Sequence, residues 1–289
     1  MYNWAMHAMP PRLLADGRDD AASISVHTHQ ELGLAYLQAG DRGPALVMLH
    51  GWGAFKELWW STLASLGRDH RCYAVDFPGH GASPIGRADS IAALADAVAA
   101  LCDALGLGAI TLIGHSMGGS VACELALRRP ELVQRLILVD AAVDPHLMPG
   151  FARTYLMPHN GWTLFRLMLL GARIASPLGA TVPHNHGGGW LRPWLRRGSY
   201  LAYFEPEALY RLYRSLFATR AGDTLRQIAA PTLVISGQLD SVVPPRHSRR
   251  VARTIPGARY VEIPGALHNP MDERPRSFER AVREFLAAS

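Results

Sequence analysis

The chain of 289 residues is long enough to bury a large core, and its 49% hydrophobic and 18% charged residues are typical of a folded globular protein. Its formal net charge is +5, but the basic residues are scattered arginines and a single lysine, Lys56. This scatter argues against a nucleic-acid-binding protein, which needs a basic patch or stripe. No uncharged apolar stretch reaches the roughly 18 residues that a membrane-spanning helix requires.

The first residues and the cysteines bear on location. Residues 1–22 are expected to form an N-terminal extension, and residues 1–20 lack the long apolar run of a secretory signal peptide. Cys72, Cys102 and Cys123 are too widely spaced for a disulfide framework or a zinc site, so we expect them to be small core residues. Together these features favour a cytoplasmic protein, and they leave the oligomeric state open.

Short apolar runs and amphipathic stretches alternate over residues 23–143, the predicted first part of an α/β core. Ser90 is a typical N-cap for the helix predicted at 90–105, and Pro130 ends the helix that follows Ser116. Strands that alternate with helices predict a mostly parallel sheet with right-handed connections. The predicted strands are residues 32–39, 45–49, 72–75, 110–113 and 136–139, and the predicted helices are 57–66, 90–105 and 116–129.

Residues 144–228 break this alternation and are predicted to form a helical insertion, with helices over 164–170 and 206–217 and a loop at 184–189. The insertion is rich in aromatic residues, which either form an apolar lid or pack as its own core, or do both. It also carries ten arginines and four acidic residues. One of these arginines could pair with a substrate carboxylate, but solvated surface charges are the more ordinary interpretation.

The alternation resumes over residues 229–289, the predicted second part of the core. Strands are predicted at 231–236 and 258–263, and each is followed by a predicted helix, at 245–255 and 275–286. The chain is therefore divided into an extension, a core in two parts and an insertion between those parts.

The sharpest motif is Gly114-His115-Ser116-Met117-Gly118, which has the form G-x-S-x-G. A predicted strand precedes it and a predicted helix follows it, which is the context of a strained turn that exposes a nucleophilic serine. The glycines permit close approach of strand and helix, and the helix N-terminus favours developing negative charge. We predict that Ser116 is a nucleophile, and the alternative is a structural turn with a capping serine.

A nucleophilic serine needs a base, and the base needs an acid to orient it. His268 is the best candidate base because it follows a predicted strand and turn and precedes the last helix, whereas His247 is expected on a surface or loop. Asp240 is the preferred acid because it lies just after the strand at 231–236. Asp140, at the end of the strand at 136–139, is the alternative acid, or else a residue that supports the start of the insertion.

Acyl transfer also needs hydrogen-bond donors for the tetrahedral oxyanion, and two loops can supply them. One predicted donor is the backbone N–H of Met117, the residue after the nucleophile. The other is the backbone N–H of Trp52, in the glycine-rich loop at 50–53. His50 is predicted to brace that loop rather than to take part in catalysis.

Five motifs in order give the chain a wider resemblance. They are HGWG at 50–53, DFPGHGAS at 76–83, GHSMGG at 114–119, GQLDSVVP at 237–244 and HNPMDERP at 268–275. In these motifs, which span nearly the whole chain, the sequence resembles the α/β-hydrolase superfamily. The resemblance implies an eight-stranded sheet with an antiparallel second strand and a cap inserted after the sixth strand. It also supports the order Ser116, Asp240, His268 for the catalytic residues.

The resemblance narrows the chemistry as well. A serine at position 116 argues against haloalkane dehalogenases and epoxide hydrolases, which need a carboxylate nucleophile. We predict a hydrolase that cleaves a carboxylic ester or related acyl bond of a small, apolar substrate, without a metal or organic cofactor. Hydrolysis of a C–C bond in a meta-cleavage product, hydrolysis of a lactone, and a non-catalytic ligand receptor on the same fold are the alternatives.

Three residues beside the motifs are candidates for the substrate pocket: Gly51, His115 and Asn269. Asn269 stands where many members of the superfamily carry a bulky apolar residue, and capping of the last helix is its preferred role, with the pocket as the alternative. The choice of substrate is expected to depend mainly on the insertion.

Overall fold

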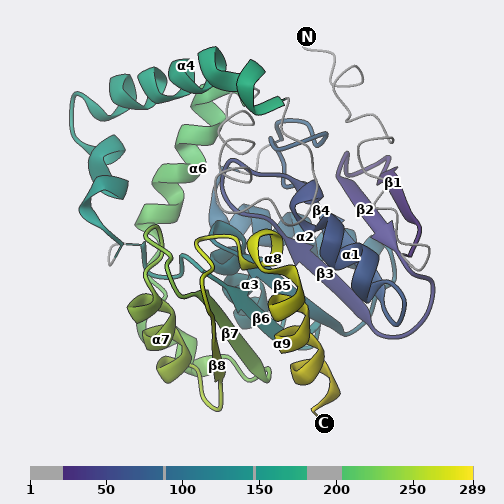
Figure 1. The fold of residues 1–289 in the computed structure, drawn as a ribbon. Coiled ribbons are helices and arrows are strands. Elements are labelled where there is room, and N and C mark those ends of the chain that lie inside the picture. The colour runs from purple at the N-terminus through teal and green to yellow at the C-terminus, as the bar shows by residue number, and fades with distance from the viewer. Residues whose placement is uncertain (1–21, 87–88, 146–147, 181–203, 289) are drawn as a thin grey trace.

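A computed structural model of the protein describes residues 22–86, 89–145, 148–180 and 204–288. These residues contain one eight-stranded sheet with helices on both faces (Figure 1). The predicted N-terminal extension, except Ala22, and the predicted loop at 184–189 lie outside the described residues. Among the described residues, no helix has both the length and the apolar character that crossing a membrane requires.

The strands follow the order β1-β2-β4-β3-β5-β6-β7-β8 across the sheet. Strand β2 is antiparallel to both of its neighbours, and the other neighbouring strands are parallel. This arrangement confirms the predicted fold class and the antiparallel second strand. The strands are β1 (Ile24–Thr28), β2 (Ala35–Ala39), β3 (Ala45–Leu49), β4 (Arg71–Val75), β5 (Ile110–His115), β6 (Val133–Val139), β7 (Thr232–Gly237) and β8 (Arg259–Ile263).

Strand β1 has no counterpart among the runs that the sequence marked as strands. It lies at the edge of the sheet, where it pairs only with β2. Its side chains are exposed or half-buried, and Val26 is 67% exposed. Because neither face of this strand is buried, its residues need not form the apolar pattern by which strands are recognised.

Helices cover both faces of the sheet, and one buried apolar cluster fills the space on each side. Helices α2, α3 and α7 pack on one face, and α1 and α9 pack on the other (Figure 1). Strands β3, β5 and β7 are buried at every position, as expected for a sheet covered on both faces. These helices are α1 (Trp60–Leu66), α2 (Ile91–Ala104), α3 (Met117–Arg128), α7 (Pro245–Thr254) and α9 (Pro275–Ala287).

Local signals explain where several helices begin. The Ser90 hydroxyl accepts a hydrogen bond from the Ala93 N–H at 3.2 Å, so Ser90 caps α2 as predicted. The predicted helix at 57–66 is divided into a 3-10 helix, η3 (Lys56–Trp59), and α1. A short helix, α8 (Pro270–Glu273), precedes α9. The three cysteines are free and buried in the core, as predicted.

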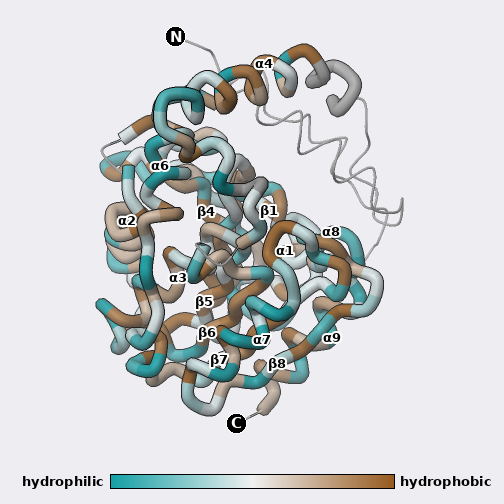
Figure 2. The backbone as a smooth tube through the Cα atoms, turned by 90° about the vertical axis from the view of Figure 1, so that its left-hand side faces the viewer, coloured by the Kyte–Doolittle hydropathy of each residue, from teal (hydrophilic) through white to brown (hydrophobic). Residues whose placement is uncertain are grey.

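The segment between β6 and β7, here called the insertion, consists of helices and connecting loops. Its longest helices are α4 (Gly161–Ala180) and α6 (Pro206–Ala218), with η5 (Gly150–Leu156) before them and η7 (Gly222–Gln227) after them. Figures 1 and 2 show α4 at the end of the molecule farthest from the C-terminus, with α6 between α4 and the sheet. The predicted domain boundaries at residues 143/144 and 228/229 fall within this segment, and the division itself stays a prediction.

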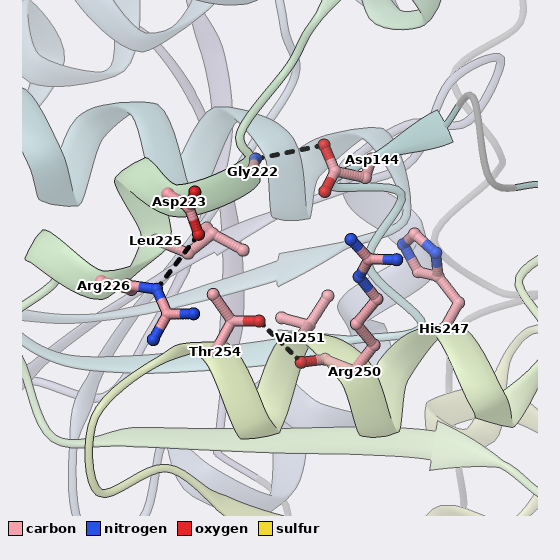
Figure 3. Close-up of a pocket in the computed structure, with 9 residues that line it drawn as sticks. All are labelled: Asp144, Gly222, Asp223, Leu225, Arg226, His247, Arg250, Val251 and Thr254. Carbon is pink, nitrogen blue, oxygen red and sulfur yellow. Dashed lines mark hydrogen bonds and ion pairs between the residues drawn. The ribbon is translucent and has the colours of Figure 1, made fainter.

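The two ends of the insertion meet at Asp144. Its carboxylate accepts hydrogen bonds from the N–H groups of Ala221 (3.1 Å) and Gly222 (3.3 Å), 77 and 78 residues further along the chain. A cavity of about 270 Å³ lies beside this contact, and Figure 3 shows His247 and Arg250 of α7 along its wall. His247 is buried on α7, so the expectation that it lies on a surface or loop is wrong. Asp144 therefore holds together the two points at which the insertion leaves and rejoins the core.

Candidate active site

Ser116 lies in the turn between β5 and α3, in a backbone conformation that side chains rarely adopt. Its φ is 53° and its ψ is −118°, and α3 begins at the next residue, Met117. The turn is held on both sides, because the Ser116 N–H donates to the Val139 carbonyl and the Ser116 carbonyl accepts from Gly119 and Ala142. A strained residue fixed in this way is typical of a functional site.

The glycines of the motif let three backbone segments meet at this turn. A Cβ atom at Gly114 would lie 2.4 Å from the Gly118 carbonyl oxygen. A Cβ atom at Gly118 would lie 2.6 Å from the carbonyl oxygens of both Leu49 and His50. Such contacts are impossible, so helix α3 can approach β5 and the end of β3 only because these positions carry no side chain.

His268 lies between Ser116 and Asp240. Its Nε2 is 3.1 Å from the Ser116 Oγ, and its Nδ1 is 2.7 Å from the Asp240 Oδ2. The three side chains come from the ends of β5, β7 and β8, which lie at the same edge of the sheet. The structure therefore brings together the three residues that the sequence singled out.

Asp240 is held as an anion by several donors. Its Oδ1 accepts the N–H groups of Val242 (2.7 Å) and Val243 (3.0 Å). Burial opposes ionisation, but the contact with His268 and the Val243 N–H outweigh it and hold the pKa of Asp240 below its ordinary value. A charged Asp240 fixes the Nδ1–H form of the His268 ring, which leaves Nε2 as an acceptor toward Ser116.

The backbone of His268 is also braced. The His115 Nε2–H donates to the His268 carbonyl oxygen at 2.8 Å, and the Leu267 N–H donates to the Glu273 carboxylate at 2.5 Å. His115 is 1% exposed. Its observed contact holds the loop that carries His268, and its place at the substrate pocket stays a prediction.

Asp140, the predicted alternative acid, lies near His268 but makes a different set of contacts. It is completely buried at the end of β6, with φ 43°, and its Oδ1 accepts the Gly237 N–H at 3.0 Å. Its carboxyl group lies beside the Asp240 carboxyl group and the His268 ring, with one atom of each residue within 4.8 Å of the other two. Burial and the neighbouring charge of Asp240 raise the pKa of Asp140 well above its ordinary value. The contact with His268 Nδ1 belongs to Asp240, and the contact that joins the ends of the insertion belongs to Asp144.

The loop at 50–53 lies directly over Ser116. A Cβ atom at Gly51 would be 3.1 Å from the Ser116 Cβ. His50 fixes this loop, because its Nδ1–H donates to the Gly51 carbonyl (2.8 Å) and its Nε2 accepts the Phe77 N–H (3.2 Å). Trp52 follows Gly51, and Met117 opens α3 on the other side of Ser116. The two predicted oxyanion donors, Trp52 and Met117, therefore lie on opposite sides of Ser116, one in the loop at 50–53 and one at the start of α3.

A buried ion pair secures the segment after this loop. The ammonium group of Lys56 is 2.7 Å from Asp76 and 2.9 Å from Glu57. Asp76 also accepts the N–H groups of Lys56 (2.8 Å) and Ala82 (2.9 Å). Lys56 is the only lysine in the chain. Through these contacts it links the start of η3 to the loop after β4. Sequence reasoning missed this role, although a lone lysine in an apolar stretch was a signal for it.

The side chain of Trp52 joins the loop to the insertion. Its indole N–H donates to the Leu209 carbonyl of α6 at 2.9 Å. Its ring packs edge-on against Phe165 (5.8 Å between ring centroids) and Tyr213 (5.2 Å). The described aromatic residues of the insertion thus pack with one another and also against the loop over Ser116, whereas Trp190, Trp194, Tyr200 and Tyr203 lie outside the described residues.

Two further expectations can be compared with the structure. Asn269 makes no side-chain cap, and α9, the predicted last helix, begins only at Pro275. The capping role is therefore wrong. Asn269 is buried beside His268, and its Oδ1 has no hydrogen-bond partner among the described residues, which leaves the pocket role as a prediction.

Those arginines of the insertion that the structure describes are exposed, which favours solvated surface charges.

The sequence matches a family model. The model describes the alpha/beta hydrolase fold, and the match covers residues 44–275. The chain belongs to the α/β-hydrolase family. The family includes enzymes, and the eight-stranded sheet of this α/β-hydrolase agrees with its membership.

Relatives of this α/β-hydrolase carry the names of several hydrolytic activities. It is 32% identical to a protein named putative carbamate hydrolase RutD from Pseudomonas savastanoi, over 85% of this chain and 94% of that protein. It is 30% identical to the pimeloyl-[acyl-carrier protein] methyl ester esterase of Nitrosomonas europaea, over 84% and 96%. Among solved structures, the enol-lactonase of Burkholderia xenovorans LB400 has a TM-score of 0.70 and 26% identity, over 88% of this chain and 96% of that one.

Proposed function

We propose that this protein is a serine hydrolase that cleaves a carboxylic ester, or a related acyl bond, through an acyl-enzyme intermediate. The observation that carries the proposal is the position of His268, with Nε2 3.1 Å from the Ser116 Oγ and Nδ1 2.7 Å from Asp240. These distances allow a proton to pass from the hydroxyl to the ring while the aspartate stabilises the charged ring.

In the proposed reaction, His268 Nε2 takes the Ser116 proton as Oγ attacks the substrate carbonyl carbon. The oxyanion accepts hydrogen bonds from the N–H groups of Trp52 and Met117. Collapse of the tetrahedral intermediate breaks the ester bond, and the His268 ring gives its proton to the departing alcohol. A water molecule, deprotonated by His268, then attacks the acyl-enzyme, which releases the acid and restores Ser116. The route needs no metal or organic cofactor.

We infer that the insertion acts as a cap that selects small, apolar substrates. Phe55 lies just after the loop at 50–53 and packs in one buried cluster with Phe165, Leu169, Phe204 and Leu209 of the insertion. An apolar wall of this kind favours an apolar acyl or alcohol group. The exposed arginines, by contrast, give no support to a substrate carboxylate.

A panel of substrates tests the proposal. We expect the purified protein to hydrolyse p-nitrophenyl esters of short acids with saturation kinetics. Lactone hydrolysis is the second candidate, because a similar solved structure is named an enol-lactonase, and the same panel should include enol-lactones. Turnover of a ring-fission diketone with failure on every ester and lactone would contradict the proposal and favour C–C bond hydrolysis.

A conservative change at Trp52 tests the link between the cap and the oxyanion donor. Trp52→Phe keeps an aromatic ring but loses the indole N–H that donates to the Leu209 carbonyl. One neutral hydrogen bond contributes about 1 kcal/mol, so we expect kcat on p-nitrophenyl acetate to fall roughly fivefold, with a smaller change in KM. Trp60→Phe, on α1 and part of the opposite cluster, is the matched control and should leave kcat unchanged. An unchanged kcat in Trp52→Phe would contradict the link.

A further inference from the structure

The carboxyl groups of Asp140 and Asp240 form a buried pair beside the base. Ligand atoms of Asp140, Asp240 and His268 all lie within 4.8 Å of one another. Asp140 is 0% exposed and Asp240 is 4% exposed. Two carboxylate oxygens are both acceptors, so they cannot hydrogen-bond to each other unless one of them carries a proton.

The remaining contacts of the pair decide where that proton lies. Asp240 uses Oδ1 for two backbone N–H groups and Oδ2 for the His268 Nδ1–H. Asp140 accepts the Gly237 N–H through Oδ1, and its buried Oδ2 has no hydrogen-bond partner among the described residues. Three donors stabilise a negative charge on Asp240, whereas Asp140 has one. The arrangement therefore favours a charged Asp240 and a neutral Asp140.

The groups around the pair give Asp140 no positive partner. His268 faces it from the loop after β8, and Asp240 and Ser236 face it from β7 and the loop that follows. His115, from β5, packs against His268 with the two rings tilted. None of the ion pairs among the described residues includes Asp140, and His268 is paired with Asp240. An ionised Asp140 would place a second buried negative charge beside Asp240, which is costly without a cation.

We propose that Asp140 is a positioning residue that remains a neutral carboxylic acid and donates a hydrogen bond from its carboxyl O–H to the Asp240 carboxylate. The pair then carries a single negative charge, and that charge faces His268. Asp140 also holds Gly237, three residues before Asp240, so it fixes both the position and the charge of the acid. The proposal rests on the proposed function only for its kinetic consequences, because the protonation of Asp140 is a property of the folded protein.

Two other features agree with a neutral Asp140. Burial and the charge of Asp240 raise its pKa well above the ordinary value. A bound cation would be the other way to join two carboxylates, but the N–H groups of Gly237, Val242 and Val243 and the His268 Nδ1–H already occupy three of the four carboxylate oxygens. A proton fits this crowded donor set better than a metal ion, which would need several free oxygens.

A pair of substitutions separates a neutral from an ionised Asp140. Asp140→Asn keeps both contacts, because the amide NH₂ donates to Asp240 and the amide oxygen accepts from Gly237, and asparagine tolerates a positive φ. We expect this conservative variant to retain kcat/KM within about threefold, with the acid limb of its pH profile unmoved. If Asp140 were ionised, the same change would remove a negative charge near His268, lower the pKa of the base and move the acid limb to lower pH. That shift would overturn the proposal.

Asp140→Ala removes both contacts and gives the complementary result. Asp240 loses a donor and becomes a stronger partner for a protonated His268, so the acid limb should move to higher pH. We expect kcat/KM to fall about 10- to 100-fold, the cost of a hydrogen bond to a charged group. An unmoved acid limb in Asp140→Ala would contradict the donor role. Asp144→Asn, which changes a buried aspartate outside the pair, is the control and should leave the acid limb in place.

Infrared spectroscopy tests the proton without any substrate. At pH 7 we expect the wild-type protein to show the carbonyl band of a protonated carboxyl group, which Asp140→Asn lacks and Asp144→Asn retains. Absence of any difference between wild type and Asp140→Asn would overturn the proposal even if the esterase activity is confirmed. A wild-type Tm that falls on dialysis against EDTA and is restored by zinc would show a cation in the pair and would also overturn it.

Thermal unfolding gives an independent readout with a defined sign. Because the pKa of Asp140 is raised in the folded state, its contribution to stability is complete below the pKa of the unfolded chain and is lost as pH rises. Asparagine does not titrate, so the Tm of Asp140→Asn relative to wild type should increase steadily from about pH 4 upwards. A Tm difference that stays constant with pH would contradict proton retention by Asp140.

Discussion

Ser116→Ala is expected to abolish both ester hydrolysis and covalent labelling by a fluorophosphonate probe. The substitution removes the only oxygen that lies within hydrogen-bond distance of the His268 Nε2 among the described residues, so no acyl-enzyme can form. Loss of the nucleophile in a triad lowers kcat by on the order of 10⁶. The measurement is kcat on p-nitrophenyl acetate, together with the stoichiometry of probe incorporation by intact-mass spectrometry.

Ser120→Ala is the matched control for this experiment. Ser120 lies one turn further along α3, is buried, and donates its hydroxyl hydrogen to the Ala142 carbonyl at 2.7 Å without touching His268. Its removal should cost about 1 kcal/mol of stability and leave labelling complete. Failure of the wild type to react, or equal labelling of Ser116→Ala, would instead favour a non-catalytic receptor on this fold.

Asp240→Asn should have the second largest effect, a fall in kcat of roughly 10³ to 10⁴. The amide NH₂ of the new side chain can donate to the His268 Nδ1, which would then act as acceptor and leave the proton on Nε2. A protonated Nε2 cannot accept the Ser116 proton, so the base is lost although its position is kept. The measurement is kcat at pH 7, with the Tm recorded to show that the variant is folded.

The matched comparison is Asp140→Asn, the same change at the other carboxyl group of the pair. Because the two aspartates are neighbours and both are buried, the comparison separates the effect on His268 from general effects of burial. A large loss of kcat in Asp140→Asn together with a small loss in Asp240→Asn would mean that Asp140 is the catalytic acid. The contact of 2.7 Å between His268 and Asp240 leads us to expect the reverse.

The predicted elements show where pattern-based prediction succeeds. Strands β3, β5 and β7 are buried along their whole length, and the sequence marks each as an apolar run. Strand β1 escaped prediction because it is an exposed edge. A helix was predicted at 164–170, but α4 extends over Gly161–Ala180, because its ends carry no strong start or stop signal.

The histidines show the limit more sharply. The sequence marked His268 as the base from its place after a strand, and the structure places it against Ser116. It gave no means of recognising His115 as a brace for the His268 carbonyl, or His247 as a buried residue of α7. The imidazole side chain is the same at all three positions. Only its neighbours in space decide which ring nitrogen donates a hydrogen bond and to which acceptor.

The fold class, the turn that carries Ser116 and the order of the three candidate residues along the chain can all be predicted from the sequence alone. These features depend on short-range signals: apolar runs, glycines at fixed spacing, and residues that directly follow strands. Only the folded structure shows that Asp240 contacts His268, that Asp140 lies beside Asp240, and that Trp52 bonds to α6. The contact of Asp140 with Gly237 spans 97 residues and that of Trp52 with Leu209 spans 157. Contacts at such separations are set by how the strands and the insertion pack, and no local pattern encodes them.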